Sequence, residues 1–284
     1  MHLNKWEVNA VGMKRIGLVM PGGGNRGAVF GGVVLAFEEA GIHHDFFVVS
    51  VGTSVGIATI PFFSTKQIAQ GLNYFTQHLP FGYPRSYYGI PYADRAYIEW
   101  AFRYSKDALD IKKLRSSRTK SYAALSDPIT QKAKYVCLNT AEDPILVLLQ
   151  AINTPLFTHP KIVAKECLWD AGITDYIPLG CPELHTVDEI WFVSPFPIDH
   201  RPGKRGGWTL YFYSWLVYLL GDPQTARLIA KAHQRECQLW DEIHERVDIK
   251  IICPDKQVPV SWRTNDPRLM KIAIQMGLEA GRKF

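Results

Sequence analysis

The chain has 284 residues, of which 47% are hydrophobic and 21% are charged. This balance is typical of a folded globular protein and excludes a mainly disordered, collagen-like or disulfide-framework chain. The formal net charge of +5 is a mild surplus spread over scattered basic residues, so nucleic acid is not expected as a partner. The length suits one large domain, and we expect a single domain over residues 1–284.

The predicted elements begin with a buried strand over Arg15–Met20, which ends at Pro21 and a glycine cluster. A helix is expected over residues 28–41, where the apolar spacing ends at a terminal glycine. A second strand, 46–50, leads directly into another glycine turn and a helical stretch over 57–75. This repeated order of strand, glycine turn and helix predicts a parallel sheet wrapped by helices.

Further along the chain, the pattern of apolar residues predicts four more strands and four more helices. The strands are expected over residues 134–139, 161–168, 189–194 and 248–253, and the helices over 94–104, 144–152, 224–244 and 267–280. The segment 80–91, rich in Pro, Gly and Tyr, is expected to form a long surface loop. The basic segment 112–120 is interpreted as a solvated loop. The expected architecture is an α/β domain.

The glycine turn after the first strand, residues 22–27, fits the GxGxxG pattern of dinucleotide-binding proteins. Such a site needs an acidic residue near the end of the second strand, and that strand ends without a carboxylate. A P-loop is excluded because no Gly-Lys-Ser/Thr is present. Successive glycines at Gly22, Gly23 and Gly24 leave backbone N–H groups unshielded, so this turn can supply donors to an oxyanion.

The second glycine turn, Gly52-Thr53-Ser54-Val55-Gly56, is a GxSxG sequence between a predicted strand and a predicted helix. Glycine at Gly52 and Gly56 leaves room where the strand turns sharply into the helix, and the central serine is held in strained geometry with its hydroxyl exposed. This position favours Ser54 as a nucleophile. The alternative is a tight turn with an incidental serine.

The sequence Trp169-Asp170-Ala171-Gly172 offers a proton acceptor for Ser54. An Asp-x-Gly turn at the end of a strand can present its carboxylate, although most turns of this kind are structural. Asp175 is the second candidate for the base, because it lies past the glycine whereas the apolar run ends directly at Asp170.

A Ser-Asp-His triad of the α/β-hydrolase type is the alternative to a Ser–Asp pair, because a histidine later in the chain could complete it. The candidates are His185, His200, His233 and His244. None of them follows a predicted strand in a recognisable loop, and the last two fall on a predicted helix. Surface or packing roles are therefore favoured for all four.

Together, the three segments resemble the patatin-like phospholipase family. They read PGGGNRGAVFGGVVLAFEEAGI, VGTSVG and WDAGITDYIPL, and QAINTPLF before the aspartate is similar to the small-residue, Pro and Phe segment of that family. The motif-bearing core covers about residues 15–195, followed by C-terminal helices over about 207–284. Two departures from the family pattern are Pro21, where Asp or a small residue is frequent, and Asp-Ala-Gly in place of Asp-Gly-Gly.

The resemblance implies a three-layer α/β sandwich with a mostly parallel central sheet and helices on both faces. It also implies a lipid acyl hydrolase that cleaves acyl esters of phospholipids or lysophospholipids through a Ser–Asp dyad and an acyl-enzyme intermediate. No metal and no cofactor are needed in this scheme. The alternatives are a soluble carboxylesterase of short acyl esters and a non-catalytic lipid-binding or regulatory protein on the same fold.

The resemblance also assigns roles to individual residues. Ser54 would attack the ester carbonyl, and Asp170 would accept its proton and later activate water. The N–H groups of the three successive glycines, Gly22, Gly23 and Gly24, would hold the oxyanion, and Arg26 would brace their loop. Gly52 and Gly56 would shape the nucleophile turn, and Gly172 the acid turn.

A peripheral membrane role is suggested by residues 208–220, thirteen residues without a charge. One interpretation is a helix in the interface of an anionic membrane, in contact through Trp208, Tyr211, Phe212 and Trp215. The other is a helix packed on the sheet. With no apparent signal peptide in residues 1–13 and no apolar run long enough to span a bilayer, we expect a cytoplasmic protein that is at most peripheral to a membrane.

Overall fold

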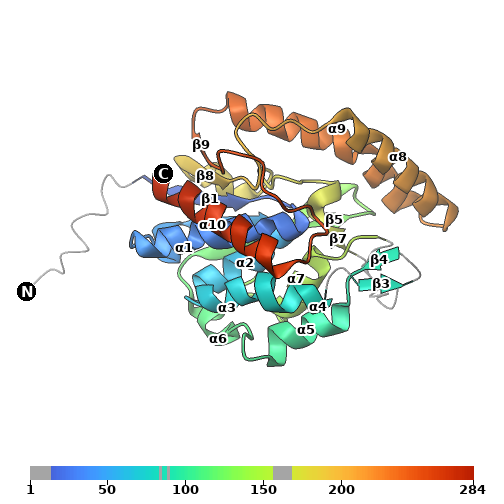
Figure 1. Ribbon diagram of the computed structural model, residues 1–284. Helices are drawn as coiled ribbons and strands as arrows, with labels where there is room; N and C mark the ends of the chain where they lie inside the picture. Colours follow the sequence, from blue (N-terminus) through green and yellow to red (C-terminus); the bar gives the residue numbers. More distant parts are fainter. Residues whose placement is uncertain (1–13, 83–84, 88–89, 156–167) are drawn as a thin grey trace, which may run out of the picture.

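The computed structural model describes residues 14–82, 85–87, 90–155 and 168–284 and is shown in Figure 1. Seven strands form its main sheet: β1 Ile16–Met20, β2 Val49–Thr53, β5 Lys120–Asp127, β6 Lys132–Cys137, β7 Trp169–Asp170, β8 Glu189–Val193 and β9 Ile249–Ile252. Their order is β6-β5-β2-β1-β8-β9, with β7 paired to β5. The sheet is mostly parallel, because only β6 and β7 run antiparallel, both to β5.

Helices cover both faces of this sheet. They are α1 Ala28–Glu39, α2 Val55–Ser64, α3 Ile68–Asn73, α4 Leu79–Gly82, α5 Arg95–Tyr104, α6 Ile111–Ser116, α7 Pro144–Ala151, α8 Lys204–Leu219, α9 Pro223–Glu245 and α10 Pro267–Lys283. Figure 1 shows α9 above the sheet and α1, α2 and α10 below it. The expected three-layer α/β architecture is confirmed.

Alternation along β1 divides the core between the two faces. Leu18 and Met20 belong to the larger apolar cluster with α1, α2 and α10, whereas Val19 joins a smaller cluster with Trp240 and Ile243 of α9. Successive side chains of a strand point to opposite faces of the sheet, so one short strand anchors both layers. The carboxyl ends of β1 and β2 lie side by side, with Met20 paired to Gly52.

Several elements differ from the sequence predictions. The central strand β5 was not predicted, and the segment 112–120, expected as a loop, contains most of α6 and the start of β5. The buried residues of β5 include Ser121, Ala123 and Ser126, which carry no strand-like apolar signal. The helical stretch 57–75 is broken between α2 and α3, where Lys66 adopts a φ of 57°.

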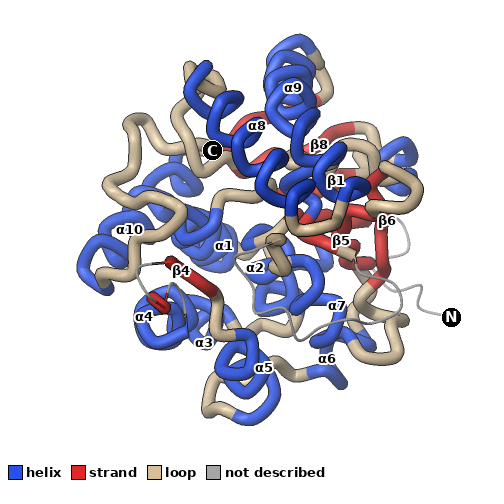
Figure 2. Tube along the Cα trace, turned by 90° about the vertical axis from the view of Figure 1, so that its right-hand side faces the viewer, coloured by secondary structure: helices blue, strands red, loops and turns tan. Residues whose placement is uncertain are grey.

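Two further predictions fall near residues that the structure leaves undescribed. The strand expected over 161–168 lies outside the described residues except for its last one, and the strand that follows is β7. The described part of 80–91 is not a loop throughout: it contains the end of α4 and an antiparallel hairpin of β3 Arg85–Tyr87 and β4 Ile90–Tyr92. Figure 2 places this hairpin beside α4.

Candidate active site

Ser54 stands alone between the end of β2 and the start of α2, in a conformation that few residues adopt. Its φ is 56° and its ψ is −124°. Such backbone geometry costs about 1–3 kcal/mol and persists only where the surroundings enforce it. The strand-to-helix turn predicted from GxSxG is therefore present, with the Ser54 side chain half-buried at its apex.

The two glycines of this turn are required by close backbone contacts. A Cβ atom at Gly56 would lie 2.2 Å from the carbonyl oxygen of Met20, and one at Gly52 would lie 2.4 Å from the amide nitrogen of Ile57. Neither position can hold a side chain without moving main-chain atoms. These contacts press the end of β2 and the start of α2 against β1, which fixes the direction in which Ser54 projects.

Asp170 is the last residue of β7 and is 8% exposed. Its Oδ1 accepts a hydrogen bond of 2.8 Å from the amide N–H of Gly172, which closes the Asp-x-Gly turn. The Asp170 main chain is held on both sides, because its N–H donates to the Asn153 carbonyl at 2.8 Å and its carbonyl accepts from the Ser126 hydroxyl at 2.8 Å. The carboxylate is therefore fixed by both backbone and side-chain bonds.

The structure brings Ser54 and Asp170 together, although 115 residues of sequence separate them. The Ser54 side chain lies near enough to the Asp170 carboxylate to act on its pKa. Burial raises the pKa of Asp170 to about 6, and Ser54 and the Gly172 N–H limit that rise. A carboxylate with this pKa is a stronger base than an exposed aspartate, whose pKa is about 4.

The amides of the glycine turn are used unequally. The Gly22 N–H donates to the Tyr176 carbonyl at 3.1 Å, so it is engaged within the protein. In the described part of the chain, no hydrogen bond uses the N–H of Gly23 or Gly24. The expectation of three oxyanion donors is therefore reduced to these two amides, which lie on a turn next to the Ser54 elbow.

This glycine turn is braced by a segment from the far end of the chain. The Asn25 N–H donates to the Trp262 carbonyl at 3.2 Å, and its side-chain amide donates to the Thr264 carbonyl at 2.6 Å. A Cβ atom at Gly24, whose φ is 56°, would lie 2.7 Å from the Trp262 carbonyl oxygen. Only glycine fits there, because the backbone needs a positive φ and its neighbour is main chain.

Arg26 lies beneath the same turn. Its guanidinium carbon is 5.1 Å from the centre of the Phe196 ring, and its buried Nε has no hydrogen-bond partner within the described residues. Burial lowers the pKa of Arg26, and the neighbouring Tyr176 and Glu236 oppose that change. These contacts place Arg26 next to the turn, and its bracing role stays a prediction.

Neither alternative to Asp170 reaches Ser54. The Asp175 carboxylate accepts hydrogen bonds from the Tyr135 hydroxyl and the Gly180 N–H, which gives it a structural role. His200 stacks on Phe196, and both ring nitrogens of His244 contact backbone carbonyls.

The other two histidines also lie apart from the pair. His185 lines a surface hollow, and His233 contacts the Cys237 thiol. Across the described ranges, no hydrogen bond links any histidine to Ser54 or Asp170.

Three residues near the site carried no sequence signal. Burial raises the pKa of Tyr176, and the nearby carboxylates of Glu236 and Asp170 act in the same direction. Burial also raises the pKa of Glu236, on α9, to about 7, against the effect of Arg26. Tyr213 of α8 lies near enough to Asp170 for that carboxylate to raise its pKa further, after burial. No local pattern marks these residues, because their roles depend on tertiary neighbours.

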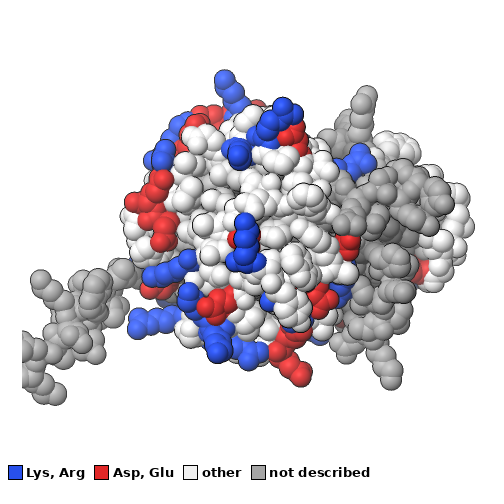
Figure 3. Space-filling view, turned by 60° about the horizontal axis from the view of Figure 1, so that its bottom comes forward, with Lys and Arg blue, Asp and Glu red and all other residues white. Residues whose placement is uncertain are grey.

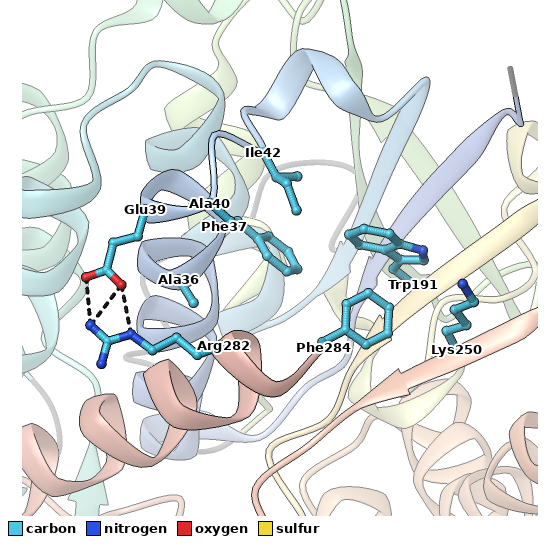
Figure 4. A pocket seen from close by; sticks show the side chains of 10 residues that line it. Ala36, Phe37, Glu39, Ala40, Ile42, Trp191, Lys250, Arg282 and Phe284 are labelled. Carbon is cyan, nitrogen blue, oxygen red and sulfur yellow. Dashed lines mark hydrogen bonds and ion pairs between the residues drawn. The ribbon is translucent and has the colours of Figure 1, made fainter.

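Within the described residues, no group of three or more His, Cys, Asp and Glu side chains is arranged to hold a metal ion. Figure 4 shows a hollow between the end of α1 and the end of α10, where Phe284 faces Trp191 and Glu39 pairs with Arg282. It lies at the amino-terminal edge of the strands and is separate from the Ser54 elbow.

Comparison with known proteins supports the fold alone. Neither a protein-family model nor a curated protein sequence matches this chain. Its structure is similar to that of VipD from Legionella pneumophila, with a TM-score of 0.58 and 12% sequence identity. The match covers 95% of this chain and 66% of VipD, so the chain spans about two thirds of that protein's length. At this identity the likeness concerns the fold, which fits a patatin-like α/β architecture.

The described helices do not include a membrane span. None of them combines the length and the apolar composition that crossing a bilayer requires.

Proposed function

We propose that this protein is a serine hydrolase that cleaves acyl esters of phospholipids or lysophospholipids with a Ser54–Asp170 dyad. The observation that carries the proposal is the proximity of a strained, half-buried serine to a buried aspartate, beside two amides without a hydrogen-bond acceptor in the described residues. The patatin-like fold and the three sequence motifs support the same assignment.

The first half of the reaction forms an acyl-enzyme. The Ser54 oxygen attacks the acyl carbonyl carbon while its proton passes to Asp170. The N–H groups of Gly23 and Gly24 receive the negative charge that develops on the carbonyl oxygen. When the ester bond breaks, the proton on Asp170 is transferred to the leaving alcohol oxygen, and the acyl group stays on Ser54.

The second half regenerates the enzyme. A water molecule attacks the acyl-serine carbonyl and gives one proton to Asp170. The same two amides hold the second oxyanion. Collapse of this intermediate returns the proton to Ser54 and releases the fatty acid. The raised pKa of Asp170 suits both directions of proton transfer, because it lies closer to neutral pH than that of an exposed carboxylate.

The test is substitution of the nucleophile with a matched serine control. We expect Ser54→Ala to lower kcat/KM at least about 10³-fold on phosphatidylcholine in mixed micelles and on the monomeric ester p-nitrophenyl butyrate. Ser64→Ala, at the other end of α2, should leave both activities near the wild-type values. A fluorophosphonate probe should label the wild type and Ser64→Ala but not Ser54→Ala.

The outcomes separate the competing functions. A folded Ser54→Ala protein that releases fatty acid at the wild-type rate would overturn the dyad. Hydrolysis of the monomeric ester alone would favour a carboxylesterase of short acyl esters. A wild type that neither hydrolyses these esters nor is labelled would favour a non-catalytic lipid-binding protein.

A further inference from the structure

The helix α8 exposes large apolar side chains where an ordinary surface helix exposes polar ones. Most of its large apolar side chains face solvent, with Trp208 77% exposed and Phe212 63% exposed. We define the aromatic face as Trp208, Tyr211, Phe212, Trp215, Leu216, Tyr218 and Leu219, all of them exposed. The sequence left open whether this stripe packs on the sheet, and in the structure it does not.

The buried side of α8 is smaller and partly polar. Val217 is 3% exposed and Ser214 is 9% exposed, and the Ser214 hydroxyl donates to the Ala226 carbonyl at 2.8 Å. This side packs against α9 in a helical hairpin, which Figure 1 shows at the edge of the molecule. Burial within the protein therefore leaves the aromatic face uncovered, and contiguous apolar patches of this kind usually mark an interaction surface.

Basic residues gather in the first part of the α8–α9 hairpin, and acidic residues in its last part. Residues 200–235 contain six Lys and Arg but only one acidic residue, Asp222, a surplus of five, whereas residues 236–245 contain four acidic residues and no Lys or Arg. On the face of the molecule seen in Figure 3, by contrast, basic and acidic residues lie interspersed near the rim. Arg201, Arg227 and Lys231 are exposed, so part of this surplus is available to an anionic surface.

The same hairpin is attached to the acid turn of the site. The Trp169 indole N–H donates to the Thr225 hydroxyl at 3.0 Å, and Arg235 donates to the Ile173 carbonyl at 3.1 Å. Ile173 packs in one apolar cluster with Val217 of α8. Through Tyr213, α8 also reaches the neighbourhood of Asp170. The aromatic face is therefore carried by a helix whose other side adjoins the proposed site.

We infer that the aromatic face of α8 docks on an anionic lipid bilayer, with the helix lying in the plane of the interface. Trp and Tyr favour the headgroup region, where their rings are buried and their polar atoms stay wet. The neighbouring Lys and Arg side chains meet the anionic headgroups, which attract basic residues near the surface. Docking rests on the proposed function in one respect: it would place the Ser54 site beside a substrate held in the bilayer.

The experiment is vesicle flotation with full-length protein. Vesicles of phosphatidylcholine with phosphatidylglycerol should carry the wild type and Ser54→Ala to the top of the gradient equally. The double variant Phe212→Asp, Trp215→Asp should bind at least about tenfold more weakly. The matched control, Trp100→Asp with Tyr104→Asp, changes two exposed aromatics on α5 and should bind like the wild type.

Two further measurements keep the inference open to refutation. The α8 double variant should hydrolyse the monomeric ester at the wild-type rate, which shows that it is folded and that the dyad is intact. Arg227→Gln with Lys231→Gln should weaken binding to anionic vesicles several-fold and leave binding to pure phosphatidylcholine unchanged.

Undiminished flotation of the folded α8 double variant would overturn the docking surface. A wild type that dimerises, does not float, and becomes monomeric with the α8 substitutions would assign the face to a second copy of the chain instead. Hydrolysis and flotation test the two proposals separately. Loss of hydrolysis in Ser54→Ala supports the proposed chemistry, and flotation of the same variant shows that docking does not depend on that chemistry.

Discussion

The two faces of the sheet are built on different principles. On one face, α1 and α10 approach so closely that a Cβ atom at Gly32 would lie 2.0 Å from the Ile274 carbonyl oxygen, and one at Gly277 would lie 2.1 Å from that of Val29. On the other face, α9 brings Glu236 toward Arg26 and Tyr176. The first face gains stability from dense apolar packing, whereas the second holds buried charge beside the candidate site.

The residues that pack α1 against α10 are thus different from the residues near the candidate site. Buried ionisable groups cost stability and gather at functional sites, although Asp175 shows that some are structural. The contact between α1 and α10, on the first face, contains none of the candidate catalytic residues. Substitutions on that face should affect unfolding, and substitutions around the acid turn should affect activity and its response to pH.

The largest effect is expected at the acid turn. Asp170→Asn should lower kcat at least about 10³-fold, because the amide cannot accept the Ser54 proton. Asp175→Asn, at the rival carboxylate, should keep activity within about tenfold of the wild type. Steady-state hydrolysis of p-nitrophenyl butyrate measures both, and equal losses in the two variants would remove the distinction between them.

On the opposite face, Gly277→Ala should destabilise the fold by about 2–4 kcal/mol, because the added methyl meets main-chain atoms that cannot move aside cheaply. Gly203→Ala is the matched control, since nothing lies within 4 Å of a Cβ atom there. Urea unfolding followed by circular dichroism gives both values. An unchanged midpoint for Gly277→Ala would show that the two helices are less closely packed than described.

The pH profile sharpens the comparison at the level of a single group. Asp170 acts as a base only when ionised, and burial raises its pKa to about 6. We therefore expect kcat/KM on the monomeric ester to rise about tenfold per pH unit below that value and to level off near pH 7. A midpoint close to 4 would indicate a solvated carboxylate and contradict the burial of Asp170.

A smaller effect is expected for Glu236, whose pKa is raised to about 7 by burial. The folded state holds this proton more tightly than the unfolded state, so stability is lost as pH rises from about 4.5 toward 7. Between pH 5 and pH 8, Glu236→Gln should gain about 1–3 kcal/mol relative to the wild type in unfolding free energy. Parallel stability curves for the two proteins would place Glu236 in solvent.

The sequence predicted the elements whose residues are periodic and apolar. β1, α1, β2, α9 and α10 lie close to their expected positions, and the resemblance carried by three glycine-containing turns indicated the right fold class. The apolar pattern did not predict β5, because this strand buries Ser121 and Ser126 where a strand pattern would show Val or Ile. These serines can be buried in a strand because their hydroxyls have hydrogen-bond partners. Those partners are distant in sequence, so apolar periodicity does not indicate them.

The candidate site was predicted to a similar depth. The pairing of Ser54 with Asp170 followed from the motifs, and the structure brings the two side chains together; their catalytic roles stay a prediction. The engagement of the Gly22 amide could not be foreseen, because its acceptor is the carbonyl of Tyr176, over 150 residues away. Helical spacing in residues 208–220 likewise predicted a stripe without telling which way it faces.

The hydrogen bonds that support the glycine turn, from Asn25 to Trp262 and Thr264, join segments that are made at different times during synthesis. Asn25 is translated before its acceptors on Trp262 and Thr264, which follow it by more than 230 residues. Until then the main chain around Gly23 and Gly24 lacks its outer support. A growing polypeptide therefore contains Ser54 well before residues 262–264 are available to support the turn beside it.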